Sequence, residues 1–137
     1  MDYLARAKGI FSGDVYATET TGIVIEDAGS DYARCSLEIR REHLNVSDTV
    51  MGGAIYTLAD FTFAIAANSE NPATVSLTGQ ITYLNPAACK KLTAEARCLK
   101  NGHMTSSYIV DVTDENGKTI ASASFTGCKT NKNIKGE

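Results

Sequence analysis

A glycine pair and a single carboxylate share one apolar stretch of the sequence. Gly52 and Gly53 begin a run of mostly apolar residues that reaches Asn68, and Asp60 lies inside it. Glycines at a helix start leave backbone N–H groups open to a ligand oxygen, because no Cβ stands in the way. A carboxylate among apolar residues is costly to bury unless it is paired, hydrogen-bonded or next to a wet cavity. The pattern indicates a site that polarises a carbonyl group, with Asp60 as a candidate base.

The spacing of these groups predicts a site built from two copies of the chain. Gly52 and Asp60 are eight residues apart, which is roughly 12 Å along one helix. One reacting carbonyl carbon cannot touch both groups within a single chain. Two antiparallel helices related by a twofold axis would bring Gly52 of one copy beside Asp60 of the other. We therefore expect a homodimer with two identical composite sites, and an inactive monomer.

The elements that position this helix follow from the spacing of apolar residues. Residues 2–11 predict a short amphipathic helix, with Asp2 as its cap and Gly13-Asp14 as its end. The long helix covers residues 52–68, and Asn71-Pro72 stops it. Strand patterns occupy residues 15–17, 22–26, 32–40, 74–84, 92–100, 104–114 and 119–128. Turn signals occupy residues 27–30, 85–86, 101–102 and 116–117.

These elements predict an α+β fold, in which an antiparallel β-sheet of five to six strands accompanies one long central helix. Apolar residues lie nearly all round that helix, so it should be buried, and a second copy of the chain would cover its far side. The predicted organisation is an N-terminal helix over residues 1–14, the sheet-and-helix domain over 15–128, and a polar, partly disordered tail over 129–137.

Composition restricts the class of protein. A chain of 137 residues fits one domain, and a net charge of -3 leaves no electrostatic footprint for nucleic acid. The N-terminus lacks the pattern of a signal peptide, and the apolar stretch at 54–67 is too short to span a bilayer. Four cysteines without CxxC spacing and only two histidines predict reduced thiols and no metal site. We expect a cytoplasmic protein with no nucleic-acid or membrane partner.

Several ordered motifs resemble those of one family, and the resemblance extends from about residue 23 to residue 126. They are Gly22-Ile-Val-Ile25, His43-Leu-Asn45, Gly52-Gly53, Leu58-Ala-Asp60, Ala67-Asn-Ser69 and Ile81-Thr-Tyr-Leu-Asn-Pro-Ala87. This set is similar to the hotdog-fold thioesterases, and among them to the PaaI-type acyl-CoA thioesterases of phenylacetate degradation. The resemblance implies a sheet that wraps the helix, protomers whose sheets pair edge to edge, and dimers that often pair into tetramers. It places the thioester at the dimer interface and implies no cofactor beyond the coenzyme A of the substrate.

The resemblance gives roles to four candidate catalytic residues. Asp60 matches the acidic residue that acts as general base on water or as nucleophile on the thioester. Gly52 matches the glycine whose amide polarises the thioester oxygen, an interaction that can lower a barrier by ~3 kcal/mol. Asn45 matches a residue that positions the water or the acyl group, and Ser76 matches a strand serine that assists the water.

Each of these roles has a structural alternative. Asp60 could bind a neighbouring Ser or Thr, or a partner cation. Asn45 could close an Asx-turn, and Ser76 could be an ordinary strand hydroxyl. For the glycine pair, the structural alternative is a tight turn into a helix that packs closely on the sheet. Gly53 fits this alternative better than Gly52 does.

Four residues are candidates for substrate binding: Met51, Gly53, Tyr56 and Tyr83. Most relatives have histidine at the position of Met51, and methionine makes only weak hydrogen bonds. Met51 could instead fill an apolar acyl pocket, because methionine adapts to irregular gaps. His43 is an alternative base, by analogy with hotdog hydratases and dehydratases, although it lies outside the helix.

The resulting hypothesis is an acyl-CoA thioesterase that hydrolyses an acyl- or aryl-acetyl-CoA at a dimer interface. A non-catalytic acyl-CoA-binding or sensing hotdog protein is the alternative, because of Met51. A hotdog dehydratase or hydratase is the third hypothesis, and it requires a well-placed histidine.

Overall fold

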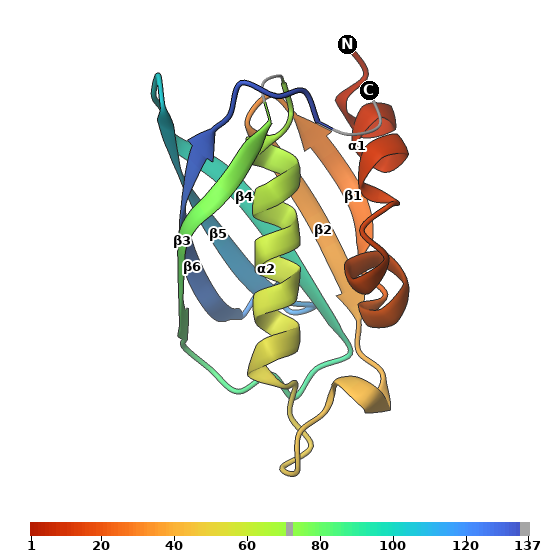
Figure 1. Ribbon diagram of the computed structural model, residues 1–137. Helices are drawn as coiled ribbons and strands as arrows, with labels where there is room; N and C mark the ends of the chain where they lie inside the picture. Colours follow the sequence, from red (N-terminus) through yellow and green to blue (C-terminus); the bar gives the residue numbers. More distant parts are fainter. Residues whose placement is uncertain (71–72, 135–137) are drawn as a thin grey trace.

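A six-stranded antiparallel sheet curves around one long helix in the computed structural model, which describes residues 1–70 and 73–134 (Figure 1). The sheet has the strand order β1-β2-β4-β5-β6-β3. The helices are α1 (Tyr3–Phe11), the π-helical turn η1 (Tyr16–Thr21), the 3₁₀ turn η2 (Arg41–His43) and α2 (Gly52–Ala67). The strands are β1 (Val24–Gly29), β2 (Tyr32–Glu38), β3 (Thr74–Tyr83), β4 (Lys91–Asn101), β5 (Thr105–Asp114) and β6 (Thr119–Lys129). The predicted α+β architecture is confirmed, with six strands.

Within one chain, helix α2 is buried on one side and open on the other, which is the side that the predicted second copy would cover. Its buried side packs on the sheet through Ile55, Leu58, Ala59, Phe61, Thr62, Phe63, Ile65 and Ala66. The opposite side, with Gly53, Tyr56, Thr57, Asp60 and Ala64, is exposed or half-buried. In Figure 1 this side faces the viewer, between β3 on the left and η1 on the right. A curved sheet contacts a straight helix on one side, so a single chain leaves the other side open.

Helix α1 forms as predicted and packs beside β1 (Figure 1). The Asp2 side chain caps it by accepting a hydrogen bond from the Ala5 amide at 3.0 Å. At its end the Phe11 ring meets Phe61 edge to face, with 6.1 Å between ring centroids. This contact attaches the N-terminal segment to α2 and sets where residues 12–21 lie.

The predicted strand at residues 15–17 is wrong, because these residues enter the turn η1. The Asp14 carbonyl accepts the Thr18 amide at 2.9 Å and the Thr18 hydroxyl at 3.0 Å. Gly22, with φ of +90°, ends the turn in a conformation that side chains disfavour. The preference of a short apolar run for a strand was therefore outweighed by local hydrogen bonds, and the segment curls against α2.

The other predicted strands are confirmed with shifts at their ends. Strand β1 runs through Gly29, past the start of the turn predicted at residues 27–30, and Asp31 takes the turn with φ of 54°. Gly117 adopts φ of +81° in the predicted hairpin between β5 and β6. Strand β6 continues to Lys129, one residue into the predicted tail. Asn71-Pro72, predicted to stop the long helix, lies outside the described residues.

Asn68 ties the end of α2 to the start of the edge strand β3. Its side-chain amide donates to the Ala64 carbonyl at 2.8 Å and the Thr74 carbonyl at 3.1 Å. Its side-chain oxygen accepts the Thr74 amide at 2.7 Å. Asn68 and Thr74 are both buried, so water cannot replace these bonds. Asn68 therefore holds the start of β3 against the end of α2.

Replacing Asn68 by alanine should therefore destabilise the protein by about 2–3 kcal/mol, because it leaves buried backbone groups of Thr74 unpaired. Urea denaturation followed by circular dichroism measures this change in the free energy of unfolding. Asn116→Ala, in an exposed turn, is the control and should cost much less. Equal effects of the two substitutions would contradict the role given to Asn68.

No helix in the described part of the chain has the length and apolarity needed to cross a membrane.

Candidate active site

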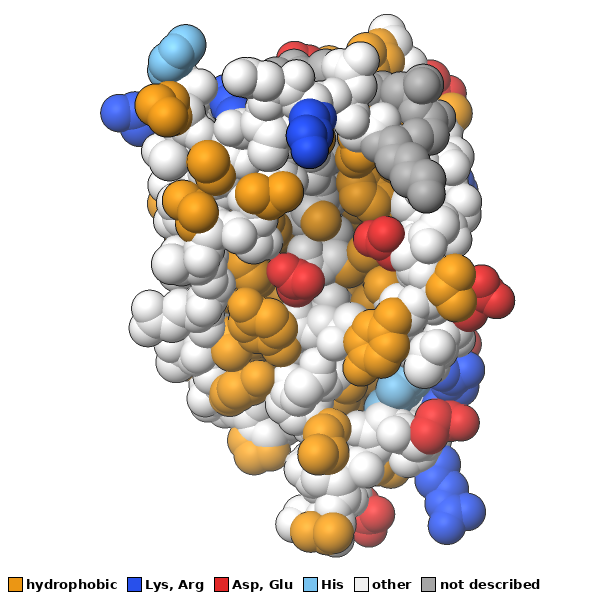
Figure 2. All heavy atoms as spheres, viewed as in Figure 1, with side chains coloured by type: hydrophobic (Ala, Val, Ile, Leu, Met, Phe, Trp, Pro, Cys, Tyr) orange, Lys and Arg blue, Asp and Glu red, His pale blue; other side chains and the backbone are white. Residues whose placement is uncertain are grey.

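Asp60 lies on the open side of α2, in a cavity of about 350 Å³. The cavity lies between α2 and the segment that leads into η1. It is lined by Asp14, Val15, Tyr16, Ala17, Tyr56, Thr57, Asp60, Phe61 and Ala64. Figure 2 shows acidic side chains over the hollowed middle of this face, with hydrophobic side chains around them. The helix thus presents its one carboxylate to a mostly apolar cavity.

The surroundings of Asp60 favour its neutral form. Burial raises the pKa of the Asp60 carboxyl above its ordinary value, and the nearby Asp14 carboxylate raises this pKa further. Within residues 1–70 and 73–134 no group donates a hydrogen bond to Asp60. The threonines of α2 are engaged elsewhere, since Thr57 donates to the Gly53 carbonyl and Thr62 to the Leu58 carbonyl. The carboxylate therefore has the character of a base rather than of a bound structural group.

This raised pKa has a consequence for stability. The folded state binds the Asp60 proton more tightly than the unfolded state does, so the stabilising contribution exists at low pH and is lost as pH rises through the folded pKa. At neutral pH the ionised carboxylate costs stability, and Asp60→Asn should raise the melting temperature. The gain should shrink as the pH falls through the raised pKa of Asp60 and should be absent below the ordinary value of 3.8. Thermal unfolding at several pH values measures it.

Glu38→Gln is the control for that experiment, because it removes an exposed carboxylate from β2 and changes the net charge equally. An Asp60→Asn protein that melts at or below the wild-type temperature at pH 7 would contradict the assignment of Asp60 as a desolvated group.

Gly52 begins α2, with Met51 at the cap position and no side chain that caps the helix. Among the described residues, no carbonyl or side-chain oxygen accepts the amides of Gly52 and Gly53. The Tyr83 hydroxyl donates to the Gly52 carbonyl at 2.8 Å. A Cβ on Gly52 would lie 3.1 Å from the Tyr83 ring, whereas one on Gly53 would meet nothing within 4 Å. Gly52 is thus the more closely packed of the two glycines, contrary to the expectation that Gly53 fits a tight turn better.

The two halves of the predicted site line different cavities of the chain. Gly52 and Tyr83 line a cavity of about 300 Å³, while Asp60 and Tyr56 line the cavity described above. Helix α2 is continuous from Gly52 to Ala67, so the separation of roughly 12 Å expected from helix geometry holds. One chain does not bring the amide and the carboxylate together.

Met51 and Gly53 line a third cavity, of about 330 Å³, which also reaches His43 and Tyr16. Met51 is 55% exposed, so its side chain is available to a ligand or partner rather than packed in the core.

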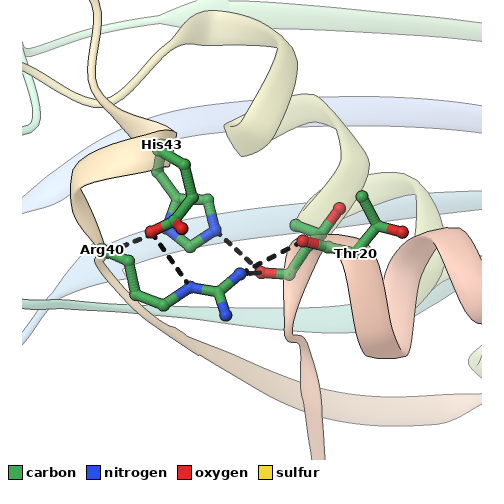
Figure 3. Close-up of polar contacts among 5 residues, drawn as sticks. Thr20, Arg40 and His43 are labelled. Atoms are coloured by element: carbon green, nitrogen blue, oxygen red, sulfur yellow. Dashed lines mark hydrogen bonds and ion pairs between the residues drawn. The ribbon is translucent and has the colours of Figure 1, made fainter.

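His43 has a structural role (Figure 3). Its Nδ1 accepts the Arg40 amide at 2.9 Å, and its Nε2 lies 2.8 Å from the Thr21 carbonyl oxygen, to which it donates. The Arg40 guanidinium donates to the carbonyls of Thr20 and Thr21, at 3.1 Å each. Nδ1 thus caps η2 and Nε2 joins η2 to η1, so His43 has no nitrogen left to act as a base.

Asn45 and Ser76 lie apart from these cavities. Asn45 closes the loop before α2: its Oδ1 accepts the amides of Ser47 and Thr49 at 2.9 and 3.2 Å, and its Nδ2 donates to the Thr49 hydroxyl at 2.9 Å. This is the Asx-turn alternative. Ser76 is exposed on the edge strand β3, opposite Gly127 of β6. Neither residue lines the cavity of Asp60 or that of Gly52.

Tyr56 lies one helical turn before Asp60, and its ring packs on Phe125 with 5.8 Å between centroids. Its hydroxyl fills the place of a Cβ on Gly79 of β3, so only glycine fits there. Tyr56 therefore closes the space between α2 and β3, as a wall of the Asp60 cavity.

The residues that the sequence analysis missed are Asp14 and Tyr16. The segment Gly13-Asp14 was interpreted only as the end of a helix, and no local signal indicates that it returns to face a residue 46 positions later.

Comparison with known proteins places the chain among thioesterases. The family model described as "Thioesterase superfamily" matches residues 48–121. The chain is 30% identical to the acyl-coenzyme A thioesterase PaaI of Escherichia coli, over 85% of this chain and 83% of that one. It is 31% identical to human acyl-coenzyme A thioesterase 13, over 76% and 77% of the two chains.

Solved structures agree with this result. The E. coli PaaI protein from the phenylacetic acid degradation operon superposes with a TM-score of 0.85 and 25% identity, over 96% of this chain and 99% of that one. The protein smu.793 of Streptococcus mutans, solved bound to acetyl-CoA, superposes with a TM-score of 0.77 and 26% identity, over 81% and 90%.

Proposed function

Because the chain belongs to the thioesterase superfamily and has its hotdog fold, we propose that it is an acyl-CoA thioesterase. The observation that carries the proposal is Asp60, a desolvated carboxylate with no hydrogen-bond donor in the described chain, on the open side of the central helix. The names of the relatives indicate the substrate class, since PaaI and the human protein are both acyl-coenzyme A thioesterases.

A dimer would complete the site. Strand β3 forms one edge of the sheet, and its Val75 and Leu77 side chains are more than half exposed. An edge with apolar side chains and unpaired backbone groups pairs readily with a second strand. Antiparallel pairing of two β3 edges would set the open sides of two α2 helices against each other, with Gly52 near the partner subunit's Asp60. Pairing of two such dimers into a tetramer would use surfaces other than the β3 edge.

The reaction then follows from the two halves. The thioester oxygen accepts a hydrogen bond from the free Gly52 amide, which stabilises the negative charge that forms on it. Asp60 removes a proton from water as the water oxygen attacks the thioester carbon. The tetrahedral intermediate collapses, the carbon–sulfur bond breaks, and the proton on Asp60 passes to the leaving thiolate of coenzyme A. The products are a free carboxylic acid and coenzyme A. Direct attack by the Asp60 carboxylate, followed by hydrolysis of the anhydride, is the other path through the same residues.

Release of free thiol from short, medium and aryl-acetyl CoA thioesters, measured with the purified protein, tests the function. We expect hydrolysis of at least one of these thioesters. No cleavage of any of them, together with tight binding of an acyl-CoA, would instead support a non-catalytic acyl-CoA-binding protein. That alternative is motivated by Met51, which is exposed at the helix start where a histidine would hydrogen-bond.

A further inference from the structure

The wall of the Asp60 cavity opposite α2 is formed by residues 14–17. The Asp14 amide donates to the Phe11 carbonyl at 3.0 Å and its carbonyl accepts from Thr18, so the backbone of this segment is held at both sides. Ala17 is buried. Val15 and Tyr16 are more than half exposed at the mouth of the cavity. Apolar side chains that are exposed around a cavity of about 350 Å³ are typical of a small-molecule site.

The charge in this cavity has one sign. Its lining contains two carboxylates, Asp14 and Asp60, and no lysine, arginine or histidine. The remaining lining groups are apolar or carry neutral hydroxyls, such as Tyr56 and Thr57. The two carboxylates act on each other across the space, since the charge of Asp14 raises the pKa of Asp60. No described group donates a hydrogen bond to the Asp14 carboxylate either.

We propose that this cavity receives the acyl group of the thioester and that Asp14 excludes acyl groups that end in a carboxylate. The proposal rests on the proposed function, since it names the substrate class of the same site. A third carboxylate in a half-buried cavity would be repelled by both acids and would find no cation to pair with. A neutral aliphatic or aryl group would meet the Val15, Tyr16 and Phe61 side chains instead. Asp14 is therefore a specificity-determining residue, and the preferred substrates are neutral acyl-CoA thioesters.

The test compares two thioesters with six-carbon acyl chains, hexanoyl-CoA and adipyl-CoA, of which only the second ends in a carboxylate. The wild-type protein should hydrolyse hexanoyl-CoA with the higher kcat/KM. Asp14→Asn should raise the ratio of adipyl to hexanoyl kcat/KM by about 5–10-fold, and Asp14→Lys should raise it further. The ratio is the informative quantity, because a change in the pKa of Asp60 or in stability alters both rates together.

Glu38→Gln, which removes an exposed carboxylate of β2, is the matched control for net charge and should leave the ratio unchanged. Hydrolysis of hexanoyl-CoA with the same ratio in wild type, Asp14→Asn and Asp14→Lys would overturn the role of Asp14 while leaving the proposed function intact. A wild-type protein that hydrolyses neither of these two thioesters, and none of the short and aryl-acetyl ones, would overturn the proposed function and the acyl assignment with it.

Discussion

Replacing Asp60 by asparagine should lower kcat/KM for a neutral acyl-CoA by about 10²–10⁴-fold, the range for loss of a general base. The amide has nearly the shape of the carboxylate but cannot take a proton from water. The assay is the release of free thiol at saturating and at limiting substrate.

Two measurements separate loss of chemistry from loss of structure. Asp60→Asn should melt above the wild-type temperature at pH 7, because it removes a desolvated charge whose pKa is raised. A loss of activity in this variant could then not be explained by unfolding. The wild-type rate should also fall as acid protonates Asp60. A variant that retains the wild-type rate would refute the assignment of Asp60 as base or nucleophile.

Replacing Gly52 by proline should lower kcat by about 10²–10³-fold, because proline removes the N–H that would stabilise the oxyanion. The fold should tolerate this change. Gly52 is the first residue of α2, where proline is favoured because its amide has no partner within the helix. Met51, with φ of -56° and ψ of 134°, already has the extended backbone that a residue before proline requires. Steady-state kinetics at saturating substrate measures the effect.

Gly52→Ala is the matched control. Its Cβ would contact the Tyr83 ring in the same way, at 3.1 Å, but the amide hydrogen remains. We expect Gly52→Ala to retain much more activity than Gly52→Pro. Equal losses in the two variants would assign the effect to crowding against Tyr83 and would remove the amide from the mechanism.

The same two variants test whether the site is shared between subunits. A mixed dimer of Asp60→Asn and Gly52→Pro chains has one site with both defects and one site with neither, if each site takes Gly52 and Asp60 from different chains. Random mixing should then restore about a quarter of the wild-type activity. No recovery in dimers shown to be mixed would place both groups of a working site in one chain.

The local signals in the sequence were sufficient for most of the fold. The extent of α2 was predictable because its glycine start and its apolar run are properties of adjacent residues. The hairpin at Asn116-Gly117 was predictable for the same reason, since the positive φ of Gly117 is a local requirement. The turn at residues 15–17 was not predictable, because hydrogen bonds from Thr18 to Asp14 outweighed the strand preference of a short apolar run.

Residue types and their spacing indicated which helix carries the candidate chemistry, and that Gly52 and Asp60 are too far apart to act within one chain. Both conclusions depend only on residue type and on the fixed rise of a helix. The folded chain was needed to see that both nitrogens of His43 are engaged by backbone groups, and that Asp14 faces Asp60 across a cavity. These relations join segments distant in the chain, and they exist only after α1 and η1 pack against α2. Asp60 alone is a candidate base. Together with Asp14, it gives the cavity a negative charge that selects neutral acyl groups.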